Sequence, residues 1–147
     1  MKIAIGSDHH GLICKELLKK QYAGVHVWID LGCAASSSVC DYPTYAQAVV
    51  QAMASGVADV GVLLCGTGAG MSIAANRCQG VYAGLAWNEE VARLNKEHDN
   101  VNVLVIPADY VTPDQAVGMV NAWLTAQFLG GRHQERIDEI KNLKCKE

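Results

Sequence analysis

The 147-residue sequence lacks several features that mark particular classes of protein. Its net charge is only -3, which argues against a surface for nucleic acid or anionic membrane. No run of 18 apolar residues occurs, so we expect no membrane-spanning helix. The apolar stretch at the start, 1–6, is too short for a secretory signal peptide. We therefore predict a cytoplasmic protein that binds neither nucleic acid nor a membrane.

Regular cysteine spacing is also absent. The six cysteines form no C-x-x-C pair, which argues against a zinc site and against a disulfide framework. We interpret them as reduced thiols of a cytosolic protein. Two nucleotide-binding signatures are missing as well. Gly66, Gly68 and Gly70 do not follow G-x-G-x-x-G, and no G-x-x-x-x-G-K-[ST] occurs.

What the sequence does contain is an alternation of short apolar runs with amphipathic segments. Its length fits one domain over residues 1–147, and a hydrophobic content of 50% is ordinary for a globular protein. Strands that alternate with helices favour an α/β fold with a five-stranded parallel sheet and helices on both faces. We predict strands over 2–6, 25–31, 59–64, 81–87 and 101–106, and helices beginning near 12, 42, 71, 88, 112 and 132.

One stretch, residues 63–72, places a cysteine and three glycines between a strand and a helix. Cys65 is the last strand residue, and Gly66, Gly68 and Gly70 follow it. Glycine permits positive φ and close approach to the backbone, so this loop can turn its N–H groups toward an anion. A helix N-terminus also lowers the pKa of a thiol, which would make Cys65 a base or nucleophile. The alternative is a buried structural cysteine before an ordinary glycine turn.

Other polar residues stand where a strand or helix is predicted to end. Asp8 and His9 follow the first strand, either as site residues or as a helix cap with a solvated histidine. Asp41-Tyr42-Pro43 precedes a helix, as part of a site or simply as its start. His98 ends a helix, where a histidine can act in chemistry or stabilise the helix dipole.

A basic group lies near the C-terminus. Arg132 and Arg136 are four positions apart, so they share one helical face, and His133 lies beside them. Two guanidinium groups at this spacing suit a phosphate. The alternative is a solvated basic face paired with Glu135 or Asp138.

Taken in this order, these segments resemble the ribose-5-phosphate isomerase B family, a group that includes galactose-6-phosphate isomerase subunits. The resemblance covers nearly the whole chain. Its cysteine–glycine and Gly-Gly-Arg-His segments are the most specific. The matching segments are 6–9, 41–43, 65–76, His98 with 102–104, and 122–124 with 130–136.

The resemblance implies a Rossmann-like three-layer sandwich and a homodimer, sometimes paired into a tetramer. It implies active sites at the subunit interface, with the helix from about 132 packed there, and neither a metal nor an organic cofactor. The implied reaction interconverts ribose 5-phosphate and ribulose 5-phosphate through an enediolate, in the pentose phosphate pathway. Two alternatives stay open: an isomerase of a six-carbon sugar phosphate (allose or galactose 6-phosphate), or a catalytically weak homologue that binds sugar phosphate.

The resemblance also implies a role for each site residue. Cys65 would be the base that moves the proton, and Thr67 and Asp8 would handle hydroxyl protons. His98 would open the sugar ring. The residues implied to bind substrate are His9, Tyr42, Gly66, Gly68, Ala69, Gly70, Ser72, Asp99, Arg132, His133 and Arg136.

Two positions depart from the family pattern. Asp99 stands where the family usually has Asn, and Asp109 stands where it usually has an arginine that binds phosphate. A carboxylate repels a phosphate dianion. We therefore expect Asp109 to turn away or to pair with a base such as Arg132 or Arg136, and we expect weaker phosphate affinity.

Overall fold

Five parallel strands form the centre of the molecule, as a computed structural model that describes residues 1–34 and 40–143 shows. The strands follow the order β2-β1-β3-β5-β4. Every predicted strand is confirmed, although the two strands at the edges of the sheet, β2 and β4, are shorter than predicted. The bounds are β1 (Lys2–Ser7), β2 (Val27–Asp30), β3 (Val60–Cys65), β4 (Ala83–Leu85) and β5 (Val103–Pro107).

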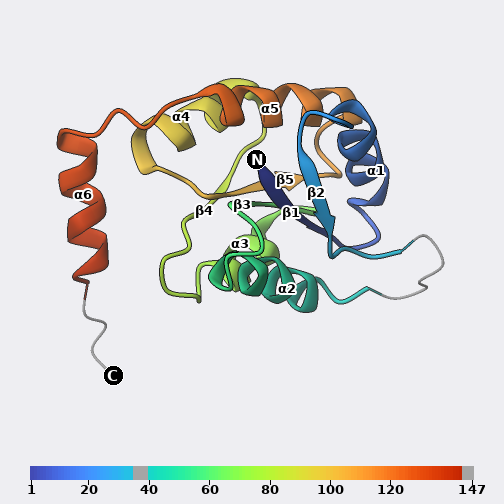
Figure 1. The fold of residues 1–147 in the computed structure, drawn as a ribbon, viewed down its shortest axis with the longest axis horizontal. Helices are drawn as coiled ribbons and strands as arrows, with labels where there is room; N and C mark the ends of the chain where they lie inside the picture. Colours follow the sequence, from blue (N-terminus) through green and yellow to red (C-terminus); the bar gives the residue numbers. More distant parts are fainter. Residues whose placement is uncertain (35–39, 144–147) are drawn as a thin grey trace.

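Helices cover both faces of this sheet, so the predicted three-layer α/β architecture is confirmed (Figure 1). One face carries α1 (Leu12–Gln21), α4 (Glu89–Asp99) and α5 (Pro113–Thr125). The other carries α2 (Tyr42–Ala54) and α3 (Ala69–Ala75). Within the described ranges, none of the helices has the length and apolarity needed to cross a membrane.

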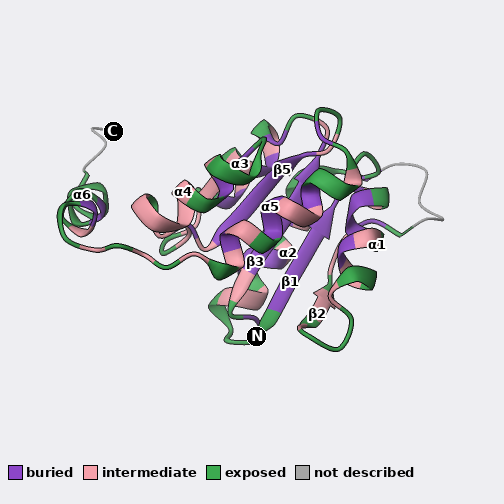
Figure 2. Cartoon of the chain, turned by 90° about the horizontal axis from the view of Figure 1, so that it is seen from above, coloured by how far each residue is buried: buried purple, intermediate pink, exposed green. Residues whose placement is uncertain are grey.

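The hydrophobic core is divided into two layers by the sheet, whose central strands are buried (Figure 2). Successive side chains of a strand point to opposite faces. Along β3, Val62 and Leu64 therefore pack with α1 and α5, whereas Leu63 and Cys65 pack with α2 and α3. This alternation places the thiol of Cys65 under the helix that follows it.

Side-chain caps fix where two helices start. The side chain of Asn88 accepts the N–H of Val91 at 2.8 Å, and Thr112 forms a capping box with Gln115, as the sequence predicts. The helix predicted to begin at 71 begins earlier, at Ala69, because Gly68 takes the left-handed conformation (φ 77°) and serves as its N-cap. The caps and this glycine set the starting points of the helices after β3, β4 and β5.

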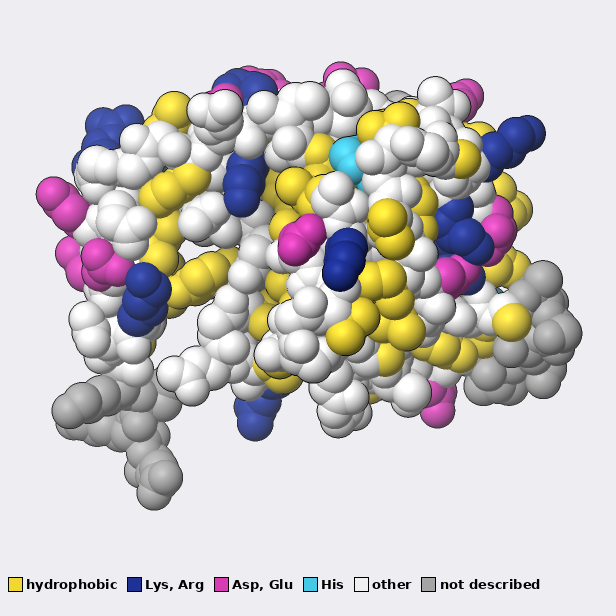
Figure 3. All heavy atoms as spheres, viewed as in Figure 1, with side chains coloured by type: hydrophobic (Ala, Val, Ile, Leu, Met, Phe, Trp, Pro, Cys, Tyr) yellow, Lys and Arg dark blue, Asp and Glu magenta, His cyan; other side chains and the backbone are white. Residues whose placement is uncertain are grey.

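The last helix, α6 (Arg132–Lys141), stands away from the body of the molecule. Gly130 and Gly131, both with positive φ, turn the chain into it. Only His133 and Ile137 of its residues are buried, whereas Ile140 is 50% exposed. Figure 3 shows a hollow between this helix and the body, with hydrophobic side chains beside it.

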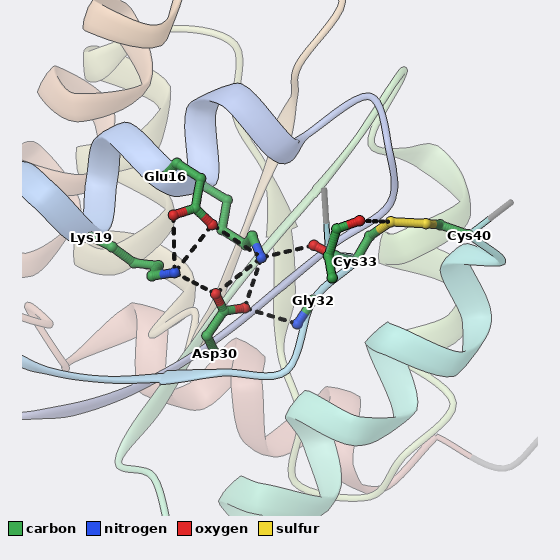
Figure 4. A network of polar contacts seen from close by, with 8 residues as sticks. Glu16, Lys19, Asp30, Gly32, Cys33 and Cys40 are labelled. Carbon is green, nitrogen blue, oxygen red and sulfur yellow. Dashed lines mark hydrogen bonds and ion pairs between the residues drawn. A yellow bond between two sulfur atoms is a disulfide. The ribbon is translucent and has the colours of Figure 1, made fainter. Parts of the chain in front are cut away.

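A disulfide corrects the interpretation of the cysteines as reduced thiols. Cys33 and Cys40 are paired, with their Cα atoms 6.0 Å apart (Figure 4). The carbonyl oxygen of Cys33 accepts a hydrogen bond from the buried Lys15, which also binds Asp30. The absence of a regular pattern argues against a framework of several bridges, but it cannot exclude one bridge that closes a short loop. Most of the segment between Cys33 and Cys40 lies outside the described residues, as does Cys145.

Candidate active site

Three loops meet at the carboxyl edge of the sheet. Strands β1, β3 and β5 are neighbours, and the register pairs Ser7 with Leu64 and Cys65 with Pro107, so all three end together. The loop after β5 is tied to the loop after β3, because the N–H of Ala108 donates to the carbonyl of Cys65 at 2.9 Å. Ligands of open parallel sheets bind at this edge.

Cys65 lies on the floor of this edge. Its side chain is buried, and the backbone N–H groups of Gly68 and Met71 lie close enough to its sulfur to favour the thiolate. Burial raises the pKa of the Cys65 thiol, the two N–H groups lower it, and the carboxylates of Asp8 and Asp109 raise it again. The net shift is upward, so the expected lowering by a helix N-terminus is wrong for the single chain, where burial outweighs the two amide groups.

The glycines after Cys65 allow close packing around the loop. A Cβ on Gly68 would lie 2.3 Å from Cδ1 of Leu85, and a Cβ on Gly70 would lie 2.6 Å from ring carbons of Tyr42. The ring of Tyr42 therefore lies directly against Gly70. Two hydroxyls belong to the same loop: Oγ1 of Thr67 accepts the N–H of Ala69 at 3.4 Å, and Oγ of Ser72 is buried without a hydrogen-bond partner in the described structure.

A carboxylate is held beside the thiol by the loop after β1. Asp8 is 6% exposed, and its Oδ1 accepts the N–H of His10 at 2.9 Å and that of Gly11 at 3.3 Å. These two bonds leave Oδ2 without a recorded partner in the described residues, so it can accept a proton or a hydrogen bond from a ligand. His9 is exposed at the rim of the same loop.

Asp109 has a partner that the sequence did not indicate, His10. Its Oδ1 lies 2.9 Å from Nδ1 of His10, and its backbone N–H donates to the carbonyl of Gly66 at 3.1 Å. The carboxylate thus pairs with His10 rather than with Arg132 or Arg136. Both members follow strand ends, which is a sequence signal, but the signal becomes usable only once β1, β3 and β5 are known to be neighbours.

The remaining predicted residues form a second group on α4 and α6. The rings of His98 and His133 stack with their centroids 4.3 Å apart and an interplanar angle of 8°. Burial lowers the pKa of His133, and the neighbouring His98, Arg132 and Arg136 lower it further. The group is therefore rich in positive charge, with Asp99 as its acidic member.

Within one chain, the residues around Cys65 and the residues around His98 and α6 lie at opposite ends of the strands. Helix α4 ends at Asp99, just before β5 begins at Val103, whereas Cys65 is level with Pro107 at the end of β5. Four residues of a strand span about 13 Å. The structure thus brings Asp8, His9, Tyr42 and 65–72 together, and it holds His98, Asp99, Arg132, His133 and Arg136 elsewhere.

The chain is similar to known sugar-phosphate isomerases over nearly its whole length. The Ribose/Galactose Isomerase family model matches residues 3–140. Ribose-5-phosphate isomerase B of Escherichia coli is 44% identical over 141 residues, which cover 95% of this chain and 93% of that protein. These matches include both the residues around Cys65 and the basic residues of α6.

Solved structures share the fold as well. A ribose 5-phosphate isomerase from Thermotoga maritima is 43% identical, with a TM-score of 0.91 over 97% of this chain and 98% of that one. Ribose-5-phosphate isomerase B from Mycoplasma genitalium with bound ribulose-5-phosphate is 39% identical, with a TM-score of 0.89 over 95% of this chain and 93% of that one. With these matches, the chain belongs to the ribose/galactose isomerase family.

Proposed function

We propose that this protein interconverts D-ribose 5-phosphate and D-ribulose 5-phosphate through an enediolate, as a step of the pentose phosphate pathway. The observation that carries the proposal is the buried Cys65 thiol, which lies near two backbone N–H groups and the buried carboxylate of Asp8. A base, an acid–base partner and oriented donors are what an aldose–ketose exchange requires. The relatives named above, one of them with bound ribulose-5-phosphate, support pentose phosphate over a six-carbon sugar.

Cys65 and the residues around it each have a part in the reaction. As a thiolate, Cys65 removes the proton from C2 of the open-chain aldose and returns it to C1. The electron pair passes to the carbonyl oxygen, so an enediolate forms, and the N–H groups of 66–70 stabilise its negative charge. Asp8 and Thr67 carry the hydroxyl proton between O1 and O2. Each proton removed is returned, so the step is an isomerisation without net redox change.

We propose a homodimer as the smallest active unit. Two carboxylates, Asp8 and Asp109, lie near Cys65, and the pKa of its thiol is shifted upward. The basic residues of α6 lie at the opposite end of the strands in the same chain. A positive charge within about 4–6 Å favours a thiolate. A second copy supplies that charge if the partner subunit's Arg132 and the partner subunit's Arg136 bind the phosphate with His9, and the partner subunit's His98 opens the ring.

Helix α6 supports this arrangement. Ile140 on this helix and Leu143 just beyond its end are 50% and 73% exposed. Because the helix extends from the body, these side chains offer an apolar face to a second copy. The helix also carries Arg132 and Arg136. Docking of the helix against a second copy therefore brings both arginines closer to the site around the partner subunit's Cys65. Two such dimers can further associate as a tetramer without changing the composition of either site.

The proposed location is the cytoplasm. The paired cysteines Cys33 and Cys40 remove the argument from reduced thiols. The remaining support comes from the substrate, because a sugar phosphate carries charge that opposes its transfer into an apolar bilayer. An enzyme for this substrate belongs in the compartment where the sugar is phosphorylated.

The proposal is tested by assaying the purified protein with ribose 5-phosphate, allose 6-phosphate and galactose 6-phosphate. We expect the highest kcat/KM with ribose 5-phosphate. A higher value with a six-carbon substrate would establish the alternative isomerase activity. Binding of sugar phosphate without turnover of any of the three would establish the weak binding homologue instead.

A further inference from the structure

We propose that His10, oriented by Asp109, is a substrate-binding residue that recognises the phosphate of the sugar in its protonated form. The proposal rests on the proposed function for the identity of the substrate. It adds a titratable cation to the carboxyl edge of the sheet. It also makes Asp109 a positioning residue, which acts on the substrate through His10.

The contacts fix His10 in one orientation. Its backbone N–H donates to Oδ1 of Asp8 at 2.9 Å, and its Nδ1 lies 2.9 Å from Oδ1 of Asp109. Asp109 is held in turn, because its N–H donates to the carbonyl of Gly66 at 3.1 Å. With Nδ1 engaged by the carboxylate, Nε2 is the ring nitrogen left for a ligand. The side chain of His10 is 42% exposed, so that ligand can reach it.

The pair also lies next to the reacting loop. A Cβ on Gly66 would lie 2.6 Å from Oδ2 of Asp109 and 3.5 Å from Cγ of His10. Gly66 directly follows Cys65, so a substrate on the thiol comes within reach of the imidazole. The absence of a side chain at Gly66 leaves the space that the pair occupies.

The groups that face His10 decide its charge. Asp109 comes from the loop after β5, and Asp8 and His9 come from the loop of His10 itself. The His9 and His10 rings lie 4.3 Å apart. The hydrogen bond from His10 to Asp109 raises the pKa of His10 above its ordinary value of 6.5, burial lowers it, and the charges of Asp109 and Asp8 raise it again. The net shift is upward, so His10 keeps its proton to a higher pH than an ordinary histidine does.

Protonation changes what the pair offers to a phosphate. Below the pKa of His10, Nε2 is an N–H donor and the cation offsets the charge of Asp109. Above it, Nε2 becomes an acceptor if Nδ1 keeps its proton for Asp109, and the carboxylate repels the substrate. The KM for ribose 5-phosphate should therefore rise as the pH rises through the pKa of His10, with a smaller change in kcat.

The kinetic test compares wild type, His10→Gln, Asp109→Asn and the control Asp114→Asn between about pH 6 and about pH 8.5. Asp114 is an exposed acid in the first turn of α5. All variants share the ionisation of the substrate phosphate, so the ratio of each variant's KM to that of wild type isolates His10. A charge-assisted hydrogen bond corresponds to about a tenfold change in binding, so His10→Gln should raise KM about tenfold at the acid end and little at the alkaline end.

The two acid variants locate the effect. Asp109→Asn should shift the inflection in KM to lower pH, because the carboxylate no longer favours the imidazolium, whereas Asp114→Asn should follow wild type. Identical pH profiles of KM for wild type and His10→Gln would overturn the proposal. An inflection that Asp109→Asn leaves in place would overturn the positioning role of Asp109.

A measurement without turnover separates this proposal from the proposed function. NMR of the imidazole resonances should show that inorganic phosphate raises the pKa of His10 in wild type, and less so in Asp109→Asn. If the protein fails to isomerise ribose 5-phosphate but phosphate still raises that pKa, the proposed function falls and the anion site stands. If the protein is active and phosphate leaves the pKa of His10 unchanged, the proposal falls.

Discussion

The rings of His98 and His133 stack almost in parallel, 4.3 Å apart, and this contact joins the end of α4 to the start of α6. A backbone hydrogen bond from the N–H of Leu129 to the carbonyl of Glu97 reinforces the junction at 3.0 Å. The junction holds the predicted ring-opening residue with two arginines on the helix that extends from the body. His98, His133 and the two arginines are therefore held together, although they are remote from Cys65 of the same chain.

Replacing His98 with Asn should damage one direction of the reaction more than the other. Ribose 5-phosphate is mostly cyclic and must be opened, whereas ribulose 5-phosphate has no such ring. We expect the initial rate with ribose 5-phosphate to fall about 10²-fold or more, as is typical when a general acid–base is lost, with a smaller loss for ribulose 5-phosphate. Equal losses at matched early times would contradict a role in ring opening and indicate proton transfer or folding instead.

Replacing Cys65 with Ala should abolish isomerisation while the fold and substrate binding persist, because the residue supplies the base and only a small buried volume is lost. The burial of its side chain predicts slow alkylation by iodoacetamide. Among the free cysteines of the described residues, the partly buried Cys78 should react first. Circular dichroism and binding of inorganic phosphate check the fold, and substantial turnover by the alanine variant would rule out Cys65 as the base.

Replacing Gly68 with Ala tests the geometry of the loop against a matched control. Gly68 and Gly80 have nearly the same positive φ, 77° and 79°, but only at Gly68 does a Cβ meet another atom, Cδ1 of Leu85 at 2.3 Å. Gly80→Ala should lower the free energy of unfolding by about 1 kcal/mol from backbone strain alone. Gly68→Ala should lower it by about 1–3 kcal/mol more and reduce kcat.

Denaturant unfolding of both variants provides the comparison. Equal losses of stability would show that the crowding at Gly68 is relieved by movement of Leu85. Unchanged kcat in Gly68→Ala would show that the loop N–H groups do not depend on this glycine.

Much of the fold follows from local pattern. The capped starts at Asn88 and Thr112 and the apolar runs of β1, β3 and β5 are short-range features, and each could be recognised from a few neighbouring residues. The bounds of β4 could not, because Ala83, Gly84 and Leu85 owe their strand conformation to pairing with β5. Pairing across the sheet is not encoded in a local window.

The site was less accessible to sequence reasoning. Cys65 and its glycines are adjacent in the chain and were identified together, but the pair His10–Asp109 joins residues 99 positions apart. The shift in the pKa of Cys65 was missed because it depends on burial beneath α3, a property of packing and not of sequence position. His98 is far from Cys65 because α4 ends where β5 begins, whereas Cys65 is level with the end of β5. This separation could have been predicted from the order of the predicted helix and strand.

The most direct test of the shared site is complementation between two inactive chains, Cys65→Ala and His98→Asn, coexpressed and assayed with ribose 5-phosphate. In a symmetric dimer each site would combine Cys65 of one chain with the partner subunit's His98. A mixed dimer then has one intact site, and random pairing predicts about a quarter of wild-type activity. Coexpression of Cys65→Ala with the double variant, which has no Cys65 in any site, is the control and should stay inactive. Recovery to about a quarter would support the account, whereas no recovery in verified mixed dimers would contradict a site shared between subunits.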